Sequence, residues 1–464
     1  MALTYGVAAL GRPTFDVPFA ESMMEKAFAA LDRAGIATVG PRKLLFDAAA
    51  TEEAIAAIKA AGPIDLMLVL QITFTDASMT VKLARAIDAP LAIWAVPEPR
   101  LGGRLRLNAF CGLNLAVHAL QKAGIAEGWL YADPDAPDLD ADLRALARPA
   151  RLKPSRAARA DVASDDAARV LDALAGAKIS VLGQHPDGFD TCDYDDATLA
   201  RLGGIAVETL ALADLFDKAR AIAPARVAGH RQAVAGVVDN LDDVDAEQLE
   251  RSLRVYCALE DVAAQGGAKG LAVRCWPEMF TEYGCAACGP MGMMNEARVP
   301  AACEADVHGA YTQLILQELA SAPAWMTDLV DIDFADDTAV LWHCGSAPLS
   351  MRDPESPAEA TIHTNRKMPL LYQFRIKPGR ITLARLSQAR GQLKLMLAGA
   401  QVVRAPMAFT GTSGTIRFDA PARQVCETIM DEGLEHHFAL TYGDHRAALK
   451  AVAARLGLPV LELT

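Results

Sequence analysis

The hydrophobic pattern of the chain changes once, after about Asp328, and this change limits the folds that the chain can adopt. Before that point, short apolar runs typical of buried strands alternate with stretches of helical period. The first such unit has strand-like runs at 3–10, 64–72 and 90–96 and helical stretches at 18–35 and 51–62. Strands that alternate with helices form parallel sheets covered on both faces. We therefore predict an N-terminal domain with a doubly wound parallel sheet.

A second unit of the same kind follows a linker. The segment 148–166 is basic, then polar, and contains proline, which is typical of a connection between domains. After it, helical and strand-like stretches alternate at 166–176, 178–184, 195–203 and 205–210, and a long helical stretch covers 246–266. This pattern predicts a second doubly wound α/β domain.

The remainder of the chain has the pattern of a β-rich domain. Short, alternating stretches separated by turn residues cover 329–345, 370–388, 391–403 and 413–420, and a last helix and strand follow at 444–457 and 459–463. Alternation with period two predicts an antiparallel sheet or barrel. The predicted fold class is thus α/β, with two parallel-sheet domains at 1–155 and 156–297 and a barrel-like β-rich domain at 298–464.

Composition excludes several classes of function. The 464-residue chain has a net charge of −13, which argues against binding a nucleic-acid backbone. We find no apolar run long enough to cross a membrane, and no signal peptide at the start. We therefore expect a cytoplasmic protein whose nine cysteines are reduced. Neither a dinucleotide fingerprint nor a Walker loop is found, so a nucleotide cofactor is not expected.

Carboxylates and imidazoles gather at the ends of several predicted elements. The four patches hold Glu278 and Glu282; Glu304, Asp306 and His308; His343; and His436, His437 and Asp444. Two carboxylates and one imidazole with open positions suit a hard or borderline divalent ion such as Mn²⁺. Because the patches lie far apart in the sequence, their spacing alone does not choose the ligands.

The order of these patches carries a resemblance to a known family. After Glu278 come "CEADVHGA" (303–310), "HCGSAP" (343–348) and "HHFALTYGDHRAALKAVAARLGLPV" (436–460). The N-terminal half adds "GRPTFD", "LAIWAVPEP" and "NAFCGLNLAVHAL". With these segments the chain resembles the L-fucose isomerase / L-arabinose isomerase superfamily, and the fucose isomerase-like branch in particular.

The resemblance implies a Mn²⁺-dependent ketol-isomerase that interconverts an aldose and a ketose through a metal-stabilised ene-diolate. It implies Glu278, Asp306 and His437 as metal ligands, with both carboxylates also catalytic: each would bind metal with one oxygen and face the substrate with the other. It further implies His343, Arg12 and Trp94 as substrate contacts.

The family also forms closed homo-oligomers, often hexamers, in which the first domain of one subunit covers the metal site of its neighbour. The resemblance therefore implies that Arg12 and the segment 94–106 complete an adjacent subunit's pocket. The expected partner is a small sugar, with no nucleic acid and no membrane.

Less specific interpretations exist for each candidate residue. Asp306 would be a helix-start residue by sequence alone, because acidic side chains favour helix N-termini. Glu282 is the rival of Glu278, His343 is equally typical of a core position, and His308 is typical of a polar helix residue. The resemblance favours His437 over His436, because the family's HxxxxYG spacing starts at His437. His436 would then point to the opposite face if the segment is a strand.

Two further groups have alternative interpretations. Arg12, Arg100, Arg104 and Arg106 are surface charges by default, although 97–108 follows a strand end, where an anionic sugar substituent would bind. Cys275, Cys285, Cys288 and Cys303 would in principle hold zinc, but a single CxxC favours small buried side chains instead. The alternative functions are a metal-dependent sugar aldolase or epimerase, and a sugar-binding protein without catalysis.

Overall fold

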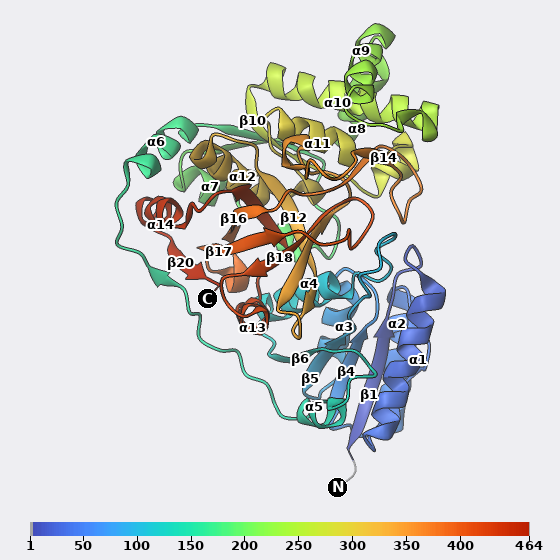
Figure 1. Ribbon diagram of the computed structural model, residues 1–464. Helices are drawn as coiled ribbons and strands as arrows, with labels where there is room; N and C mark the ends of the chain where they lie inside the picture. The colour runs from blue at the N-terminus through green and yellow to red at the C-terminus, as the bar shows by residue number, and fades with distance from the viewer. Residues whose placement is uncertain (1–2, 464) are drawn as a thin grey trace.

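The computed structural model describes residues 3–463 and is shown in Figure 1. Its N-terminal unit contains a parallel sheet of order β2-β1-β4-β5-β6, with β3 also paired to β1. The strands are β1 (Thr4–Leu10), β2 (Ala37–Val39), β3 (Leu44–Leu45), β4 (Leu66–Gln71), β5 (Leu91–Ala95) and β6 (Glu127–Tyr131). The helices are α1 (Val17–Arg33), α2 (Ala48–Ala61), α3 (Ser78–Ala86), α4 (Ala109–Lys122) and α5 (Leu139–Ala145).

The second unit contains a smaller parallel sheet of order β11-β10-β8-β9. Its strands are β8 (Lys178–Leu182), β9 (Ala206–Leu210), β10 (Ala268–Val273) and β11 (Ala301–Ala302). Its α-helices are α6 (Asp165–Leu174), α7 (Asp196–Arg201), α8 (Leu212–Ala221), α9 (Pro224–Ala235), α10 (Ala246–Gly266) and α11 (Cys288–Glu296). The unit also contains three short helical turns, η1 (Asp190–Cys192), η3 (Met279–Tyr283) and η4 (Cys303–Ala305).

The C-terminal unit is built on a closed barrel. Strand β18 pairs with β13, and the ladder continues through β12, β19, β16 and β17 back to β18. These strands are β12 (Trp325–Asp333), β13 (Thr338–His343), β16 (Gly379–Ser387), β17 (Lys394–Val403), β18 (Thr412–Phe418) and β19 (His437–Tyr442). Around them lie α12 (Val307–Ala320), α13 (Ala422–Glu432), α14 (Arg446–Arg455), β14 (Glu359–Thr361), β15 (Leu371–Arg375) and β20 (Pro459–Glu462). Closure leaves the ring without a free edge.

The predicted fold class is therefore confirmed: parallel sheets come first, and a large mixed sheet with a closed ring follows. Two short strands pair across the predicted boundary at 297. β7 (Ala158–Arg159), which lies within the linker, pairs with the C-terminal β20, and β11 pairs with the second sheet although it lies beyond 297. The domain limits themselves stay predictions.

Local signals explain why the helices begin and end where they do. Helix α10 starts after Asp245, whose side chain accepts a hydrogen bond from the backbone N–H of Gln248 at 2.8 Å. It ends at Gly267, which adopts φ 65°, a left-handed conformation that glycine accepts without steric cost. Helix α4 is buried from Ala109 to Gln121, because it packs against both β5 and the barrel strand β12. It joins the N-terminal unit to the barrel (Figure 1).

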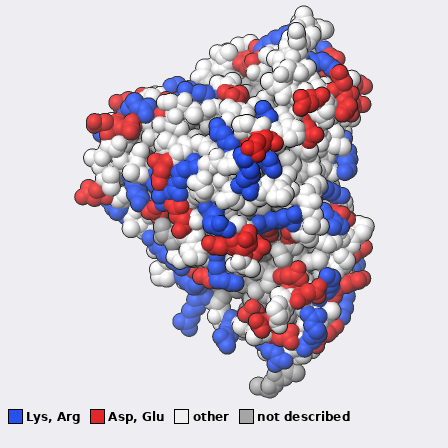
Figure 2. All heavy atoms as spheres, viewed as in Figure 1, with Lys and Arg blue, Asp and Glu red and all other residues white. Residues whose placement is uncertain are grey.

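No helix within residues 3–463 is long and apolar enough to cross a membrane. Basic and acidic side chains lie intermixed on the face shown in Figure 2.

The linker is fixed to the C-terminal unit by a buried ion pair. Lys394 and Glu432 lie 2.7 Å apart, and each side chain is only 1% exposed. Glu432 also accepts hydrogen bonds from the Ser155 hydroxyl at 2.8 Å and the Arg156 backbone N–H at 2.6 Å. One carboxylate thus joins the barrel strand β17, helix α13 and the linker.

We expect Glu432→Ala to lower the free energy of unfolding by about 3–5 kcal/mol, because it leaves the Lys394 ammonium buried without a partner. Denaturant titration followed by tryptophan fluorescence measures the effect. The control is Asp135→Ala, which breaks an ion pair to Lys26 with both side chains at least half exposed, where the expected loss is under about 1 kcal/mol. Equal midpoints for the two variants would contradict this role of Glu432.

Candidate functional site

The barrel brings one carboxylate and one imidazole face to face. Asp328 on β12 and His437 at the start of β19 are direct partners in the antiparallel ladder. Directly opposed residues project to the same face of a sheet, with Cβ atoms about 4.5–5.5 Å apart. Asp328 Oδ1 lies 3.4 Å from His437 Nε2, and both side chains are largely buried. The register between β12 and β19 is therefore enough to bring Asp328 and His437 together.

A second carboxylate enters from the turn before α12. Glu304 lies in η4 with φ 57°, and Ala305 follows with φ 57°, a left-handed conformation that is unusual for residues with a side chain. This turn directs Glu304 Oε2 to within 3.6 Å of His437 Nε2 and 3.2 Å of His436 Nε2. The other oxygen accepts a hydrogen bond from the Trp276 indole N–H at 3.1 Å.

The electrostatics of this site favour the ionised form of Glu304. Burial acts to raise the pKa of Glu304, but the hydrogen bond from His436 and the two adjacent imidazoles outweigh it, so the pKa falls to about 2. A carboxylate that stays charged in a buried position needs compensating positive charge or hydrogen bonds.

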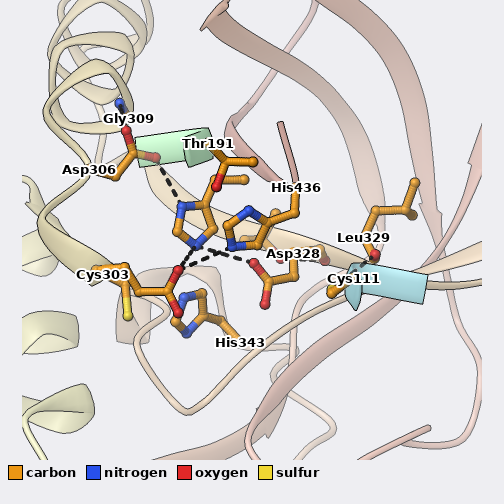
Figure 3. A network of polar contacts seen from close by, with 12 residues as sticks. Cys111, Thr191, Cys303, Asp306, Gly309, Asp328, Leu329, His343 and His436 are labelled. Atoms are coloured by element: carbon orange, nitrogen blue, oxygen red, sulfur yellow. Dashed lines mark hydrogen bonds and ion pairs between the residues drawn. The ribbon is translucent and has the colours of Figure 1, made fainter. Parts of the chain in front are cut away.

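Glu304, Asp328 and His437 together form a candidate metal site. His437 belongs to two groups of residues whose donor atoms lie within 4.8 Å of one another. One group contains Glu304 and His436, and the other contains Asp328 and His343. Asp328 Oδ1 is buried and accepts no hydrogen bond, which is unusual for a buried oxygen. Two carboxylates and one imidazole from three different elements match the donors that Mn²⁺ accepts. Figure 3 shows Asp306, Asp328, His343 and His436 gathered around this point.

Asp306 lies behind His437 rather than among the inward-facing donors. Its Oδ2 lies 2.9 Å from His437 Nδ1, and the same oxygen bonds the guanidinium of Arg385. Its Oδ1 accepts the backbone N–H of Gly309 at 2.8 Å, which caps α12. Burial would raise the pKa of Asp306, but the charges of Arg385 and His437 hold it well below its ordinary value. A carboxylate on the far nitrogen of a ligand histidine fixes the tautomer and the ring orientation.

Glu278 does not join this cluster. It lies at the start of η3, and its two oxygens bond Nε and a terminal nitrogen of Arg274, each at 2.7 Å. In the part of the chain that the structure describes, none of the groups with metal-ligand distances contains Glu278. The bidentate pair to Arg274 occupies both of its oxygens, so the structure separates Glu278 from Asp306 and His437. Its rival Glu282 is exposed.

The two neighbouring histidines do not point to opposite faces. His436 precedes the first residue of β19, so the alternation of a strand does not apply to it. Its ring lies 3.9 Å from that of His437, and both Nε2 atoms face Glu304. His308 is buried in α12, and its ring nitrogens have no hydrogen bond.

The predicted substrate contacts separate into two groups. Arg12 and His343 both line the pocket that contains Glu304 and Asp328. Arg12 lines the pocket of its own chain. That it completes the pocket of an adjacent subunit stays a prediction. Trp94 lies outside: it is fully buried in β5, and its indole N–H donates to the Ala132 carbonyl at 2.9 Å.

The arginines after Trp94 are held by partners of their own. Arg100 bonds Asp331 at 2.6 Å, and Arg106 bonds Asp16 at 2.9 Å. Arg104 bonds the Asn365 side chain at the rim of the pocket, at 3.1 Å. These contacts tie the N-terminal unit to the barrel and to the pocket.

The four cysteines near the site do not assemble as one zinc centre. Cys275, Cys288 and Cys303 line the pocket, and Cys285 is buried elsewhere. Cys275 and Cys303 are neighbours, with sulfurs 2.8 Å apart. Across residues 3–463, no group with metal-ligand distances contains more than one cysteine.

Asp328 was not predicted from the sequence, and Glu304 was named in a candidate patch but not chosen as a ligand. The sequence of β12, WMTDLVDID, holds three aspartates, so nothing in it singled out Asp328. Glu304 lies two residues before Asp306, which has the familiar pattern of a helix-capping aspartate. The direction of the Glu304 side chain depends on the left-handed turn, which no sequence pattern indicates.

Comparisons with known proteins agree with this architecture. Residues 6–155 match the family described as fucose/sulfoquinovose isomerase, N-terminal domain, and residues 341–464 match L-fucose isomerase, C-terminal domain. A sulfoquinovose isomerase from Alkalicoccus urumqiensis is 29% identical over 405 residues, which cover 86% of each chain. One from Clostridium sp. (strain MSTE9) is 29% identical over 453 residues, which cover 97% of this chain and 96% of the relative.

The two family matches together span more than half of the chain, and the relatives extend along nearly all of it. They confirm the resemblance drawn from the ordered segments. The chain belongs to the fucose isomerase-like family.

Proposed function

We propose that this chain, an aldose–ketose isomerase by its family, acts on sulfoquinovose or a closely related sulfonated hexose with the help of a divalent ion, Mn²⁺ in the first place. The observation that carries the proposal is the approach of two pocket-lining carboxylates, Glu304 and Asp328, to Nε2 of His437, in a chain whose relatives are named sulfoquinovose isomerases. The metal and the substrate are both part of the proposal.

In this proposal Glu304, Asp328 and His437 hold the ion. Two observations support this set: Asp328 Oδ1 is buried without a hydrogen bond, and both carboxylates approach Nε2 of His437. A divalent ion bound there supplies a Lewis acid for O1 and O2 of the sugar. Asp306 keeps Nδ1 of His437 engaged, so Nε2 is the nitrogen that faces the carboxylates.

The carboxylates also supply the proton transfer. Interconversion of an aldose and a ketose moves one proton between C1 and C2 and another between O1 and O2. Glu304 and Asp328 enter from different elements on the two sides of His437 Nε2. One of them takes the carbon-bound proton and returns it to the neighbouring carbon, and acid–base catalysis of this kind contributes about 10²–10⁴-fold.

In this proposal His343 contacts the substrate. Its Nδ1 accepts the backbone N–H of Cys344 at 2.9 Å, which leaves Nε2 as the nitrogen available to a ligand. We further propose a cytoplasmic homo-oligomer, with a hexamer as the first expectation.

The activity is tested with the intact protein, Mn²⁺ and sulfoquinovose in D₂O. We expect the corresponding ketose, with solvent deuterium at C1 or C2 and all carbon–carbon bonds intact, read by NMR. Matched reactions with 6-deoxyglucose and glucose show whether the sulfonate matters. Cleavage products would support an aldolase instead, and inversion without ketose would support an epimerase.

The imidazole ligand is tested by comparing His437→Gln with His343→Gln. We expect His437→Gln to lose or weaken the bound metal, because it removes one of three protein ligands. His343→Gln should keep its metal and show a raised KM or a lowered kcat. Metal analysis of the purified variants, with folding checked by circular dichroism, measures both. Metal loss confined to the His343 variant would reverse the assignment.

The roles of Glu304 and Glu278 are distinguished by replacing each of them with glutamine. We expect Glu304→Gln to lose metal and to lower kcat by about 10²–10⁴-fold, because it removes a ligand and a proton-transfer group. Glu278→Gln should retain its metal, because both oxygens of Glu278 face Arg274. A Glu278 variant without metal beside a Glu304 variant with metal would restore the ligand set implied by the family resemblance.

A further inference from the structure

Two guanidinium groups converge at the pocket, around the ring of Trp276. Arg12 lies 5.1 Å from the centroid of this ring, and Arg366 lies 5.7 Å from it. Both arginines line the same pocket as Glu304. The indole N–H of Trp276 also donates a hydrogen bond to Glu304. Trp276 therefore contacts both the two arginines and the proposed catalytic carboxylate.

The two arginines differ in their charge balance. Arg12 forms an ion pair with Asp76 at 2.7 Å, so its charge is neutralised within the protein. Among the described residues, no carboxylate forms an ion pair with Arg366, which instead packs against the rings of Trp276 and Phe280. Burial, and then the nearby charge of Arg12, lower the pKa of Arg366. With Glu304 and Asp328 assigned to the divalent ion of the proposed function, the region keeps about one uncompensated positive charge.

The backbone that carries Arg366 is anchored, so its side chain has a defined position. The ring of His363 accepts the backbone N–H groups of Asn365 and Arg366 at Nδ1, each at 3.2 Å. Arg104 holds the Asn365 side chain at 3.1 Å and the Thr14 carbonyl at 2.8 Å. The N-terminal unit thus fixes the loop from which Arg366 extends. An anchored backbone with a side chain lacking an acidic partner is what a ligand-binding arginine requires.

We infer that Arg366 determines substrate specificity by pairing with a singly charged anionic group on the sugar, remote from C1 and C2. Arg12 adds a hydrogen-bond donor to the same anion but no net charge, because Asp76 balances it. This inference rests on the proposed function. It adds the residue that selects the charged substrate and the number of charges that this residue selects. A sulfonate carries one negative charge, whereas a phosphate monoester carries about −1.5 to −2 at pH 7. The pocket is therefore matched to a sulfonate and not to a phosphate.

The first test compares Arg366→Gln with the wild type on sulfoquinovose and on 6-deoxyglucose, which lacks the charge. For the sulfonated sugar we expect KM to rise by about 10- to 100-fold, the range of one charge-assisted hydrogen bond. The kinetic constants for the neutral sugar should stay within about twofold, since a structural defect would lower both activities. Arg366→Lys should restore part of the affinity, because it returns the charge.

Arg423→Gln is the matched control. Arg423 also lies over an aromatic ring, 4.3 Å from the centroid of Phe334, but it does not line this pocket. Its loss should leave the preference for the sulfonated sugar unchanged.

The charge count is tested with Asp76→Asn, which releases the charge of Arg12. We expect glucose 6-phosphate, a weak competitor of the wild-type enzyme, to inhibit this variant at least several-fold more strongly, because two positive charges suit a dianion. Unchanged inhibition by glucose 6-phosphate would contradict the charge balance between Arg12 and Asp76.

Binding separates this inference from the proposed reaction. Calorimetric titration with sulfoquinovose, without added metal, measures the anion contact independently of turnover. Binding that Arg366→Gln abolishes supports the anion site even if no ketose forms, in which case the proposed function alone fails. Equal losses on charged and neutral sugars, or unchanged sulfonate binding by the Arg366 variant, would overturn the inference.

Discussion

The buried ion pair between Asp306 and Arg385 is the interaction on which the rest of the site depends. Their side chains are 0% and 1% exposed. The Asp306 carboxylate caps α12 and holds His437 on β19, while Arg385 on β16 also donates to the Thr191 carbonyl in η1 at 2.9 Å. A buried charge pair is tolerated when further hydrogen bonds satisfy both partners. Here those bonds connect the second α/β unit, the helix and two barrel strands.

This arrangement explains how three distant segments form one site. The register of β12 with β19 sets Asp328 opposite His437, and the left-handed turn before α12 adds Glu304. Asp306 then locks the ring of His437 from behind. None of these side chains relies on a mobile loop, because each lies on or next to a barrel strand or a capped helix. Rigid elements hold catalytic groups more precisely than loops do.

Much of the fold could be predicted from the sequence because its signals are local. The strand-like runs at 66–71 and 91–95 and the helix at 246–266 carry strong periodicity and clear ends, and they form as expected. The barrel was predicted as a class, but its closure through β17 and β18 depends on long-range pairing that alternation does not encode. The pairing of β7 and β11 across the predicted limit at 297 is long-range in the same way.

The site was predicted less completely, and the reasons are physical. His437 was favoured because the family's spacing from the ligand histidine to Tyr-Gly starts there, and His343 because it lies at a predicted strand end. The resemblance implied Glu278, with Glu282 as its rival, although Arg274, four residues earlier, was visible as a partner. The left-handed turn that directs Glu304 toward the imidazoles is not written in the neighbouring residues. Asp328 depends on register, and a single-residue shift would have turned it to the other face.

The distribution of charge shows why composition is a poor guide to a pocket. The chain carries a net charge of −13, yet arginines converge on one side of the pocket. At about 0.1 M salt, exposed charges more than about 10 Å apart are largely screened, so the overall charge has little influence inside a shielded cavity. The groups close to the pocket are instead Glu304 and Asp328, which hold the ion in the proposed function, and Arg366, which has no acidic partner among the described residues. Trp276 contacts both Glu304 and Arg366, so in the proposed function a substrate whose charge lies at the end away from its carbonyl would bind with C1 and C2 toward Glu304.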